Sequence, residues 1–256
     1  MTKEVRAKKF LGQHFLTDET IAKNIVDALA DKSRVLEVGA GMGVLTKYLI
    51  NTVNDFKVIE IDKESVNYLN ENLEGIHDKL IEGDFLKISL QDLFPNEKFS
   101  LIGNFPYNIS NLILFKVFEN KDIIHEVVGM FQQEVAMRVA CKSGSKAYGI
   151  LSVLLSAFYD IEYLFTVSNQ VFSPPPKVTS AVIRLTRNNI TDLGVKQDDF
   201  VRVVKTAFNQ RRKMLRQSLK PLQVDLSKID ERFLTLRPEQ INTQDFITIT
   251  KQIYNV

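Results

Sequence analysis

The sequence has only one cysteine and three histidines in 256 residues, and it contains no long apolar run. The single cysteine, Cys141, excludes an internal disulfide and fits a reducing compartment. Neither it nor His14, His77 and His125 shows the spacing of metal ligands, so we expect no metal site. No segment approaches the roughly 18 apolar residues needed to span a membrane, and no run of signal-peptide length follows the N-terminus. These absences predict a cytoplasmic protein that uses neither metal nor membrane.

The basic residues are unevenly placed, although the net charge is only +2. Residues 1–187 contain 21 basic and 23 acidic residues, whereas residues 188–256 contain 12 and 8. The segment Arg202–Lys220 contains seven basic residues and no acidic one. A second cluster lies in the N-terminal arm, where Lys3, Arg6, Lys8 and Lys9 outnumber Glu4. Two basic patches on a near-neutral chain predict a polyanionic partner.

Short apolar segments alternate with segments of helical periodicity through most of the chain. We expect strands at 34–38, 56–61, 80–81, 99–102 and 127–131, and helices that include 18–30, 63–73 and one capped by Ser110. This alternation predicts an α/β fold, a doubly wound sheet with helices on both faces. Later strands are expected at 162–167 and 178–185, after a helix at 150–158. A polar linker at 187–196 separates a predicted domain 1–187 from a small helical C-terminal domain 188–256.

The loop Gly39-Ala-Gly-Met-Gly43 follows the first strand of the expected sheet. Glycine permits a close approach of backbone to ligand, and the carboxyl ends of parallel strands are where such sheets bind nucleotides. Glu60 ends the second strand, 21 residues after Gly39, where an acid can accept hydrogen bonds from both ribose hydroxyls. Asp62 is a competing acid, unless it caps the next helix. The pattern predicts an adenosine site for either a dinucleotide or S-adenosylmethionine.

Gly83-Asp84-Phe85 follows the third strand at the same end of the sheet. The Asp84 carboxylate can accept a hydrogen bond from an adenine amine, and Phe85 can cover the ring. The alternative is that Asp84 only caps a turn, as aspartate often does.

Asn104-Phe105-Pro106-Tyr107 follows the fourth strand. The N6 lone pair of adenine is delocalised into the ring, so acceptors aimed at both N–H groups would localise it. The side-chain oxygen of Asn104 and the carbonyl of Phe105 are candidates, and Pro106 fixes the backbone. Tyr107 offers a flat face for a flipped base. The alternative is a proline turn with a packed tyrosine. The tetrapeptide occurs together with Glu60 and the glycine loop, however, and this combination favours methyl transfer from S-adenosylmethionine to adenine.

Taken together, the motifs resemble the KsgA/RsmA/Dim family of ribosomal RNA adenine N6,N6-dimethyltransferases. The motifs, in family order, are Lys9-Phe-Leu-Gly-Gln-His-Phe-Leu16, Val35-Leu-Glu-Val-Gly-Ala-Gly-Met-Gly-Val-Leu-Thr46, Val58-Ile-Glu-Ile-Asp62, Gly103-Asn-Phe-Pro-Tyr-Asn-Ile-Ser110, Met130-Phe-Gln-Gln-Glu-Val-Ala-Met-Arg138, Phe172-Ser-Pro-Pro-Pro-Lys-Val-Thr-Ser180 and Phe208-Asn-Gln-Arg-Arg-Lys-Met-Leu-Arg216. The resemblance implies a Rossmann-like, S-adenosylmethionine-dependent enzyme that dimethylates two adjacent adenosines in the 3′-terminal hairpin of 16S rRNA. It also implies a role in biogenesis of the small ribosomal subunit.

The resemblance also implies roles for particular residues. The cofactor would be bound by His14, Leu16, Gly39, Gly41, Glu60, Asp84, Phe85 and Asn104. Tyr107 and Phe172 would sandwich the target base. His14 stands where several relatives carry asparagine, and Phe105 replaces the commoner leucine. Because Phe105 would act through its backbone carbonyl, we expect this replacement to be tolerated.

Two features have competing interpretations. Phe172 precedes three prolines that stiffen its loop, so it could be a stacking platform, or it could be a core aromatic. The basic run could grip phosphates or form a solvated helix face, and its lack of acids favours phosphates. The predicted RNA-binding residues are Lys8, Lys9, Arg211, Arg212, Lys213 and Arg216.

Three other functions are compatible with parts of the pattern. An Erm-type enzyme would share the fold and tetrapeptide but methylate 23S rRNA, and the triple-proline loop and the basic segment disfavour it. A dehydrogenase would have no use for Asn104–Tyr107, and the glycine loop lacks G-x-G-x-x-G spacing. A non-catalytic assembly factor would not need the cofactor residues. We expect a monomer whose partner is 16S rRNA within the small subunit or its precursor.

Overall fold

The protein, seen in a computed structural model, is described over residues 5–255, so Lys3 and Glu4 of the basic arm lie outside the described residues. Contacts group the chain into two compact units. The sheet unit comprises the residues up to Ala136 together with Ile161–Arg187. The helical unit comprises Met137–Asp160 together with the residues from Asn188 onward.

The division differs in one respect from the predicted boundary between residues 187 and 188. Residues 137–160, expected in the N-terminal domain, group with the C-terminal residues. Apolar packing is the reason, because α6 (Ile150–Ser156) is buried along most of its length and contacts α7 (Gln197–Asn209) and α10 (Thr243–Tyr254). A helix that is apolar on nearly all sides must be enclosed by other elements, and here those elements come from the end of the chain.

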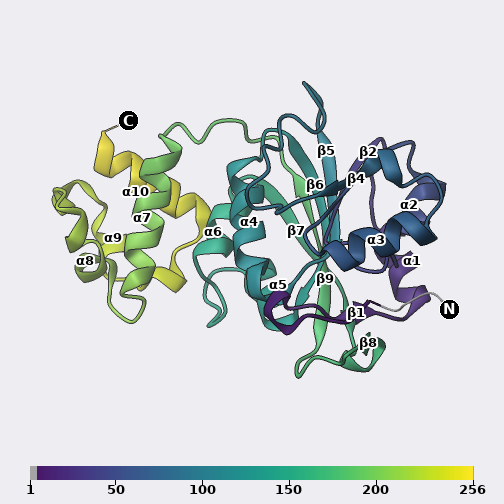
Figure 1. The fold of residues 1–256 in the computed structure, drawn as a ribbon. Coiled ribbons are helices and arrows are strands. Elements are labelled where there is room, and N and C mark those ends of the chain that lie inside the picture. The colour runs from purple at the N-terminus through teal and green to yellow at the C-terminus, as the bar shows by residue number, and fades with distance from the viewer. Residues whose placement is uncertain (1–4, 256) are drawn as a thin grey trace. The chain divides into compact units, whose positions relative to one another are not determined.

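Among the described residues, seven strands form one sheet in the order β4-β3-β2-β5-β6-β9-β7 (Figure 1). The neighbours from β4 to β6 pair in parallel, and β9 pairs antiparallel with β6. The chain runs outward from β2 to β4 and then restarts at β5 on the other side of β2, so the strand order reverses between β2 and β5. The bounds are β2 (Arg34–Val38), β3 (Asp55–Glu60), β4 (Leu80–Glu82), β5 (Phe99–Asn104), β6 (Ile124–Gln132), β7 (Tyr159–Val167) and β9 (Ser180–Arg187).

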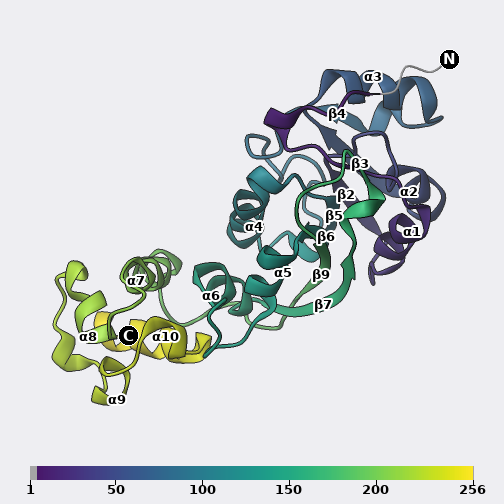
Figure 2. The ribbon, with the colours of Figure 1, turned by 90° about the horizontal axis from the view of Figure 1, so that it is seen from below.

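Helices cover both faces of this sheet, as expected, with α1 and α2 on one side of β2 and β5 and α4 on the other (Figure 2). Asp18 caps α1 by accepting from the N–H groups of Thr20 and Ile21. The predicted cap Ser110 is instead the first residue of α4, because a 3-10 turn leads into that helix, and its Oγ donates to the Pro106 carbonyl at 3.1 Å. The bounds are α1 (Glu19–Asp27), α2 (Thr46–Thr52), α3 (Lys63–Asn72), α4 (Ser110–Glu119), α5 (Gln133–Ala140), η1 (Lys9–Leu11), η2 (His77–Lys79), η3 (Tyr107–Ile109) and η4 (Asn169–Val171).

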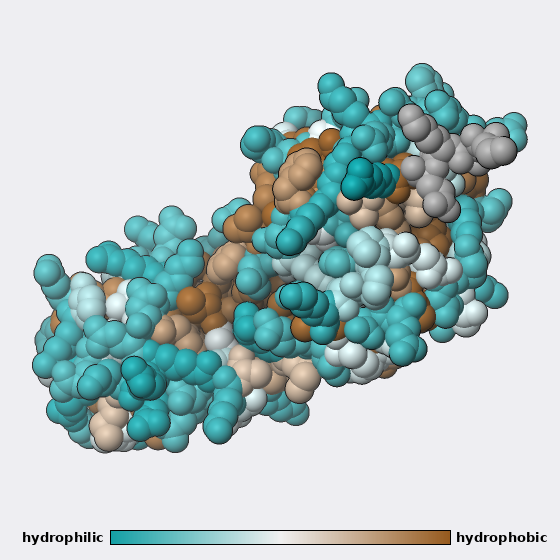
Figure 3. All heavy atoms as spheres, turned by 60° about the horizontal axis from the view of Figure 1, so that its bottom comes forward, coloured by the Kyte–Doolittle hydropathy of each residue, from teal (hydrophilic) through white to brown (hydrophobic). Residues whose placement is uncertain are grey.

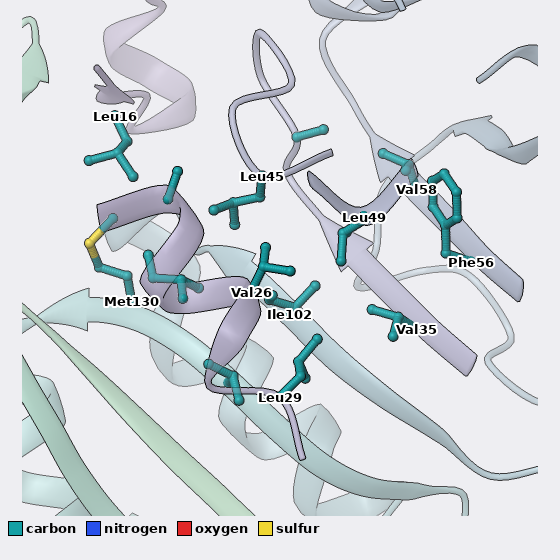
Figure 4. Packing of buried hydrophobic residues seen from close by; sticks show 14 of the residues in the cluster. Leu16, Val26, Leu29, Val35, Leu45, Leu49, Phe56, Val58, Ile102 and Met130 are labelled. Atoms are coloured by element: carbon teal, nitrogen blue, oxygen red, sulfur yellow. The ribbon is translucent and has the colours of Figure 1, made fainter. Parts of the chain in front are cut away.

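The main core of the sheet unit lies between α1, α2 and the strands (Figure 4). Its members include Val26 and Leu29 from α1, Leu49 from α2, and Val35 and Ile102 from neighbouring strands. Full burial of one such side chain contributes about 1.5–3 kcal/mol. This packing holds the strands, and therefore their carboxyl ends, in fixed positions. Two short strands, β1 (Phe15–Leu16) and β8 (Phe172–Ser173), pair antiparallel beside it.

The helical unit is built around α6, α7 and α10. The inward face of α7 is buried at Phe200, Val203, Val204 and Ala207, and the Phe208 ring lies 5.9 Å from the Phe246 ring of α10. The buried Leu215 and Leu219 do not continue this face, because α7 ends at Asn209 and the chain turns before α8. The remaining bounds are α8 (Leu215–Ser218), α9 (Glu231–Leu234), η5 (Lys220–Leu222), η6 (Leu226–Lys228) and η7 (Pro238–Gln240).

Hydrophilic residues predominate on the face shown in Figure 3, and apolar residues reach that surface in separate patches. Several large apolar side chains are exposed, and Phe10 is the most exposed of those described, at 77%. Within residues 5–255, no helix is long and apolar enough to cross a membrane. The same residues contain no group of three histidine, cysteine or acidic side chains arranged to hold a metal ion.

Candidate active site

A pocket opens at the carboxyl ends of β2, β3 and β5, where the strand order reverses. This is the position at which open α/β sheets bind ligands. The pocket is lined by every residue that the sequence assigned to the cofactor or to the tetrapeptide: His14, Leu16, Gly39, Gly41, Glu60, Asp84, Phe85, Asn104, Phe105, Pro106 and Tyr107. Segments that lie up to about ninety residues apart in the chain therefore meet at one site in the sheet unit.

The glycine loop is held close to its surroundings. Gly39 and Gly41 have φ angles of 75° and 57°, which residues other than glycine rarely adopt. A Cβ at Gly41 would lie 2.9 Å from the Phe15 ring, so only glycine fits. The Gly41 N–H donates to Glu60 Oε2 at 2.8 Å, which fixes the loop against the end of β3.

Glu60 is buried at 3% exposure, and its second carboxylate oxygen accepts from the Asp62 N–H at 2.8 Å. Burial raises the pKa of Glu60, while the hydrogen bonds from Asp62 and Gly41 oppose that rise. The Ile61 N–H also lowers the pKa of Glu60, so three backbone donors act on this carboxylate, and of its about four acceptor positions at least one remains for a further donor. Asp62 itself caps α3 and is not a pocket residue, as the alternative interpretation of this acid predicted.

Glu37 is a pocket residue for which sequence reasoning gave no role. It is completely buried, and its carboxylate accepts from Thr46 Oγ at 2.7 Å. Burial raises its pKa to about 8, because the Thr46 bond only partly offsets desolvation and the nearby Glu60 adds to the rise. The sequence signal that could have identified Glu37 is a single acid within the otherwise apolar stretch 35–38 of β2.

Asp84 serves as a turn cap and also lines the pocket. Its Oδ1 accepts from the Leu86 N–H at 3.0 Å. Lys116, another residue that the sequence analysis missed, stabilises this turn through hydrogen bonds. Lys116 Nζ donates to the carbonyls of Phe85 and Ile88 at 2.6 and 2.7 Å, and it lies 5.1 Å from the Phe85 ring. A lysine in the apolar helix 110–119 was the available signal.

The Asn104 side chain is oriented by a backbone carbonyl. Its Nδ2 donates to the carbonyl of His14 at 3.0 Å. A carbonyl can only accept, so the amide nitrogen must face it and the Oδ1 must be the free end. Within residues 5–255, no group donates a hydrogen bond to this oxygen. The amide therefore presents an acceptor at the pocket, as the predicted chemistry requires.

The Phe105 ring anchors the tetrapeptide in the sheet. It is 1% exposed and lies 5.0 Å from the Phe131 ring, and its N–H donates to the Met130 carbonyl at 3.1 Å. Gly103 and Gly129 pair across β5 and β6 and leave room for it. A Cβ at Gly129 would lie 2.2 Å from the Phe105 ring, and one at Gly103 would lie 2.8 Å from it. The position of the Phe105 carbonyl therefore depends on two glycines.

Tyr107 is held at both ends. Its ring lies 5.4 Å from the His14 ring, at an angle of 30°, and its hydroxyl shares a hydrogen bond with Ser180. His14 in turn bonds the Pro174 carbonyl at 2.7 Å, which fixes the ring beside Tyr107. Burial raises the pKa of Tyr107.

The structure does not bring Phe172 to the pocket. Its ring is 4% exposed and belongs to the hydrophobic core, and Phe172 pairs with Leu16 across β1 and β8. The core interpretation of this aromatic matches the observed packing. The base-stacking role of Phe172 stays a prediction, and it requires the ring to leave the core.

The predicted RNA-binding residues divide into paired and unpaired cations. Lys8 forms ion pairs with Asp62 and Glu64, Arg211 with Glu239, and Arg216 with Glu231. The lack of acids within the basic run therefore did not exclude ion pairs, because the partners come from later in the chain. Lys9, Arg212 and Lys213 are exposed, and no carboxylate of the described residues lies within ion-pair distance of them.

The chain is similar to known proteins over nearly its whole length. The family model described as ribosomal RNA adenine dimethylase matches residues 4–247. The ribosomal RNA small subunit methyltransferase A of Bacteroides thetaiotaomicron is 53% identical over 98% of this chain and 95% of its own length. The protein of the same name from Cytophaga hutchinsonii is 54% identical over 98% of both chains.

Two solved structures share the fold. A dimethyladenosine transferase from Plasmodium falciparum superposes with a TM-score of 0.79 at 24% identity, covering 92% of this chain and 96% of its own. The 23S rRNA methyltransferase ErmE superposes with a TM-score of 0.66 at 25% identity, covering 94% and 99%. The expected Rossmann-like methyltransferase fold is confirmed.

Proposed function

Because the chain belongs to the ribosomal RNA adenine dimethylase family, we propose that it transfers methyl groups from S-adenosylmethionine to N6 of two adjacent adenosines in the 3′-terminal hairpin of 16S rRNA. The product is N6,N6-dimethyladenosine. The protein acts as a cytoplasmic monomer on the small ribosomal subunit or its precursor. The observation that carries the proposal is the free Oδ1 of Asn104, presented in the same pocket as the buried carboxylate of Glu60.

The chemistry of the pocket residues fits S-adenosylmethionine. Glu60 combines burial with acceptor capacity, which suits the ribose hydroxyls, and Gly39 and Gly41 permit close approach of the backbone. Asp84 and the neighbouring Phe85 offer an acceptor and an aromatic face for the adenine. When bound, S-adenosylmethionine supplies a methyl group on an electron-poor sulfonium.

The tetrapeptide prepares the target amine. Asn104 Oδ1 and the Phe105 carbonyl accept from the two N–H groups of N6, which favours a pyramidal nitrogen with a localised lone pair. Pro106 restricts the backbone, and Tyr107 stacks on the flipped base. Catalysis rests on orientation and on dipoles fixed before the reaction, so a strong general base is not required before attack. The methylated nitrogen is cationic until it releases one proton to water, so one N–H remains after the first transfer, and a single acceptor suffices for the second.

The RNA would be held chiefly by the unpaired cations. Lys9, Arg212 and Lys213 are exposed and have no carboxylate partner within residues 5–255, so they can neutralise phosphates. Lys8, Arg211 and Arg216 already neutralise carboxylates, so they would contribute less unless those ion pairs open. The helical unit would then contribute to binding through the turn that contains Arg212 and Lys213.

A methylation assay tests this function. The purified protein, labelled S-adenosylmethionine and small-subunit particles from a strain that lacks the enzyme should yield label in 16S rRNA, and mass analysis should identify N6,N6-dimethyladenosine. The same assay with large-subunit particles is the control. Label confined to 23S rRNA would support the Erm-type alternative. Cofactor binding without any RNA methylation would support a non-catalytic assembly factor.

A further inference from the structure

Phe10 combines high exposure with a rigidly held backbone. At 77%, its side chain is more exposed than any other large apolar side chain of residues 5–255. Its backbone belongs to the 3-10 turn Lys9–Leu11, which ends at Gly12 with a φ of 67°. Asn108, which directly follows Tyr107, donates its Nδ2 to the Phe10 carbonyl at 3.2 Å.

The loop that carries Phe10 is fixed at further points. Lys8 Nζ and Gln13 Nε2 both bond the Asp62 carboxylate, and the Lys8 N–H donates to Gln13 Oε1 at 2.8 Å. A Cβ at Gly12 would lie 2.7 Å from Asn108 Oδ1, so the loop also packs closely against the residue after the tetrapeptide. An exposed aromatic on such a loop loses little conformational entropy when it binds a partner.

The position of Phe10 relates it to the pocket. The next six residues, Leu11–Leu16, all line the pocket, whereas Phe10 does not. Phe10 thus directly precedes the lining residues in the chain, and its carbonyl is bonded to Asn108, which lines the pocket, so its backbone lies at the edge of the lining formed by the N-terminal loop. Arg6 and Lys9 flank it in sequence, and both are exposed. An aromatic ring flanked by cations is the pattern of a stacking site for single-stranded nucleic acid, because the ring takes the base and the cations take the phosphates.

We propose that Phe10 is a further base-stacking residue, which binds the unpaired nucleotide next to the adenosine held in the pocket. The inference rests on the proposed function, in which adjacent adenosines are modified in turn. When the target base leaves the stack, the neighbouring base loses a stacking contact. A fixed aromatic ring beside the pocket would replace that contact. Phe10 is thus a binding residue for RNA and contacts neither the cofactor nor the target amine.

A series of substitutions tests the proposal with the full-length protein and small-subunit particles. Phe10→Ala should raise the KM for particles roughly fivefold to a hundredfold, as loss of one base–aromatic stack does. It should leave the Kd for S-adenosylmethionine and the thermal unfolding midpoint unchanged, because the ring is exposed. Phe10→Trp should retain the wild-type KM, whereas Phe10→Leu, which keeps apolar bulk without a π face, should behave like Phe10→Ala. Met137→Ala, at a residue with 51% exposure that does not line the pocket, is the matched control and should have no effect.

The outcomes separate this inference from the proposed function. If wild type methylates the particles and Phe10→Ala has the same KM, the stacking site is overturned and the function stands. A wild-type KM for Phe10→Leu would indicate an apolar contact with a protein of the particle, and it would also overturn stacking. Absence of 16S rRNA methylation by wild type would refute the proposed function itself.

Discussion

The pocket at the strand ends and the basic turn at residues 210–214 hold their polar groups in opposite ways. In the pocket, Glu60 and Asn104 are each fixed by backbone groups before any ligand binds. In the turn, Arg212 and Lys213 extend into solvent without a carboxylate partner among the described residues. Fixed dipoles suit a reaction that needs orientation, whereas exposed cations suit phosphates whose positions vary. Substitutions in the pocket should therefore change turnover or stability, and those in the turn should change RNA affinity and its dependence on salt.

Asn104→Ala should have the largest effect. Removal of one fixed dipole from a transition state typically costs about 10²–10³-fold in kcat. The Kd for S-adenosylmethionine, measured by calorimetry, should change little, because the proposed cofactor contacts rely mainly on Glu60 and Asp84. Asn70→Ala, at an exposed asparagine of α3, is the control and should be fully active. Wild-type kcat in Asn104→Ala would remove the proposed role of the amide oxygen.

The packing beneath the tetrapeptide offers a second test. Gly129→Ala places a methyl group against the Phe105 ring, and overpacking of this kind typically costs about 1–3 kcal/mol. We expect a lower free energy of unfolding, measured with urea, and a reduced kcat because the Phe105 carbonyl shifts. Phe105→Leu combined with Gly129→Ala should recover part of both losses, since the smaller side chain makes room. Strictly additive effects in this double-mutant cycle would show that the two positions are independent.

Glu37, in the pocket, makes the free energy of unfolding depend on pH. Because its pKa is raised to about 8, the folded protein retains a proton that the unfolded chain releases above an ordinary carboxyl pKa of about 4.3. The contribution of Glu37 to stability is therefore largest below that ordinary pKa and declines as the pH rises toward 8. Glu37→Gln, which stays neutral, should become more stable relative to wild type between pH 5 and pH 8, as measured by urea unfolding. A stability difference that does not change with pH would contradict the buried, protonated carboxyl.

Substitutions in the basic turn should have the smallest effect on turnover. Arg212→Ala and Lys213→Ala should each weaken RNA binding and reduce the slope of log K against log salt by about 1, with kcat and thermal stability unchanged. Arg211→Ala, the matched comparison, should also lower thermal stability, because Arg211 forms an ion pair with Glu239 and donates a hydrogen bond to the Lys146 carbonyl. Filter binding over a range of salt concentrations measures the slopes. An unchanged slope for Arg212→Ala and Lys213→Ala would mean that neither residue contacts phosphate.

The pocket was predictable because parallel strands bring their carboxyl ends together whatever the intervening sequence. Glu60 and Asn104 end β3 and β5, and Asp84 follows β4, so the strand pattern was enough to group them. The role of Gly129 was not predictable, because it depends on the register that sets Gly129 beside Gly103.

Other features depended equally on contacts that the local sequence does not specify. Phe172 is fixed by the pairing of two very short strands, which leave no periodic signal. Arg211 and Arg216 appeared unpaired in sequence because their acidic partners, Glu239 and Glu231, lie in later elements. Local patterns therefore predicted the elements and the strand-end site, whereas pairing across elements decided which side chains remain available.

The most direct test of the central claim is a crystal structure with S-adenosylhomocysteine and an RNA hairpin that contains the target adenosine. The account predicts that the flipped adenine stacks on Tyr107, with N6 at hydrogen-bond distance, about 2.7–3.2 Å, from both Asn104 Oδ1 and the Phe105 carbonyl. An adenine bound with N6 directed away from these two oxygens would contradict it.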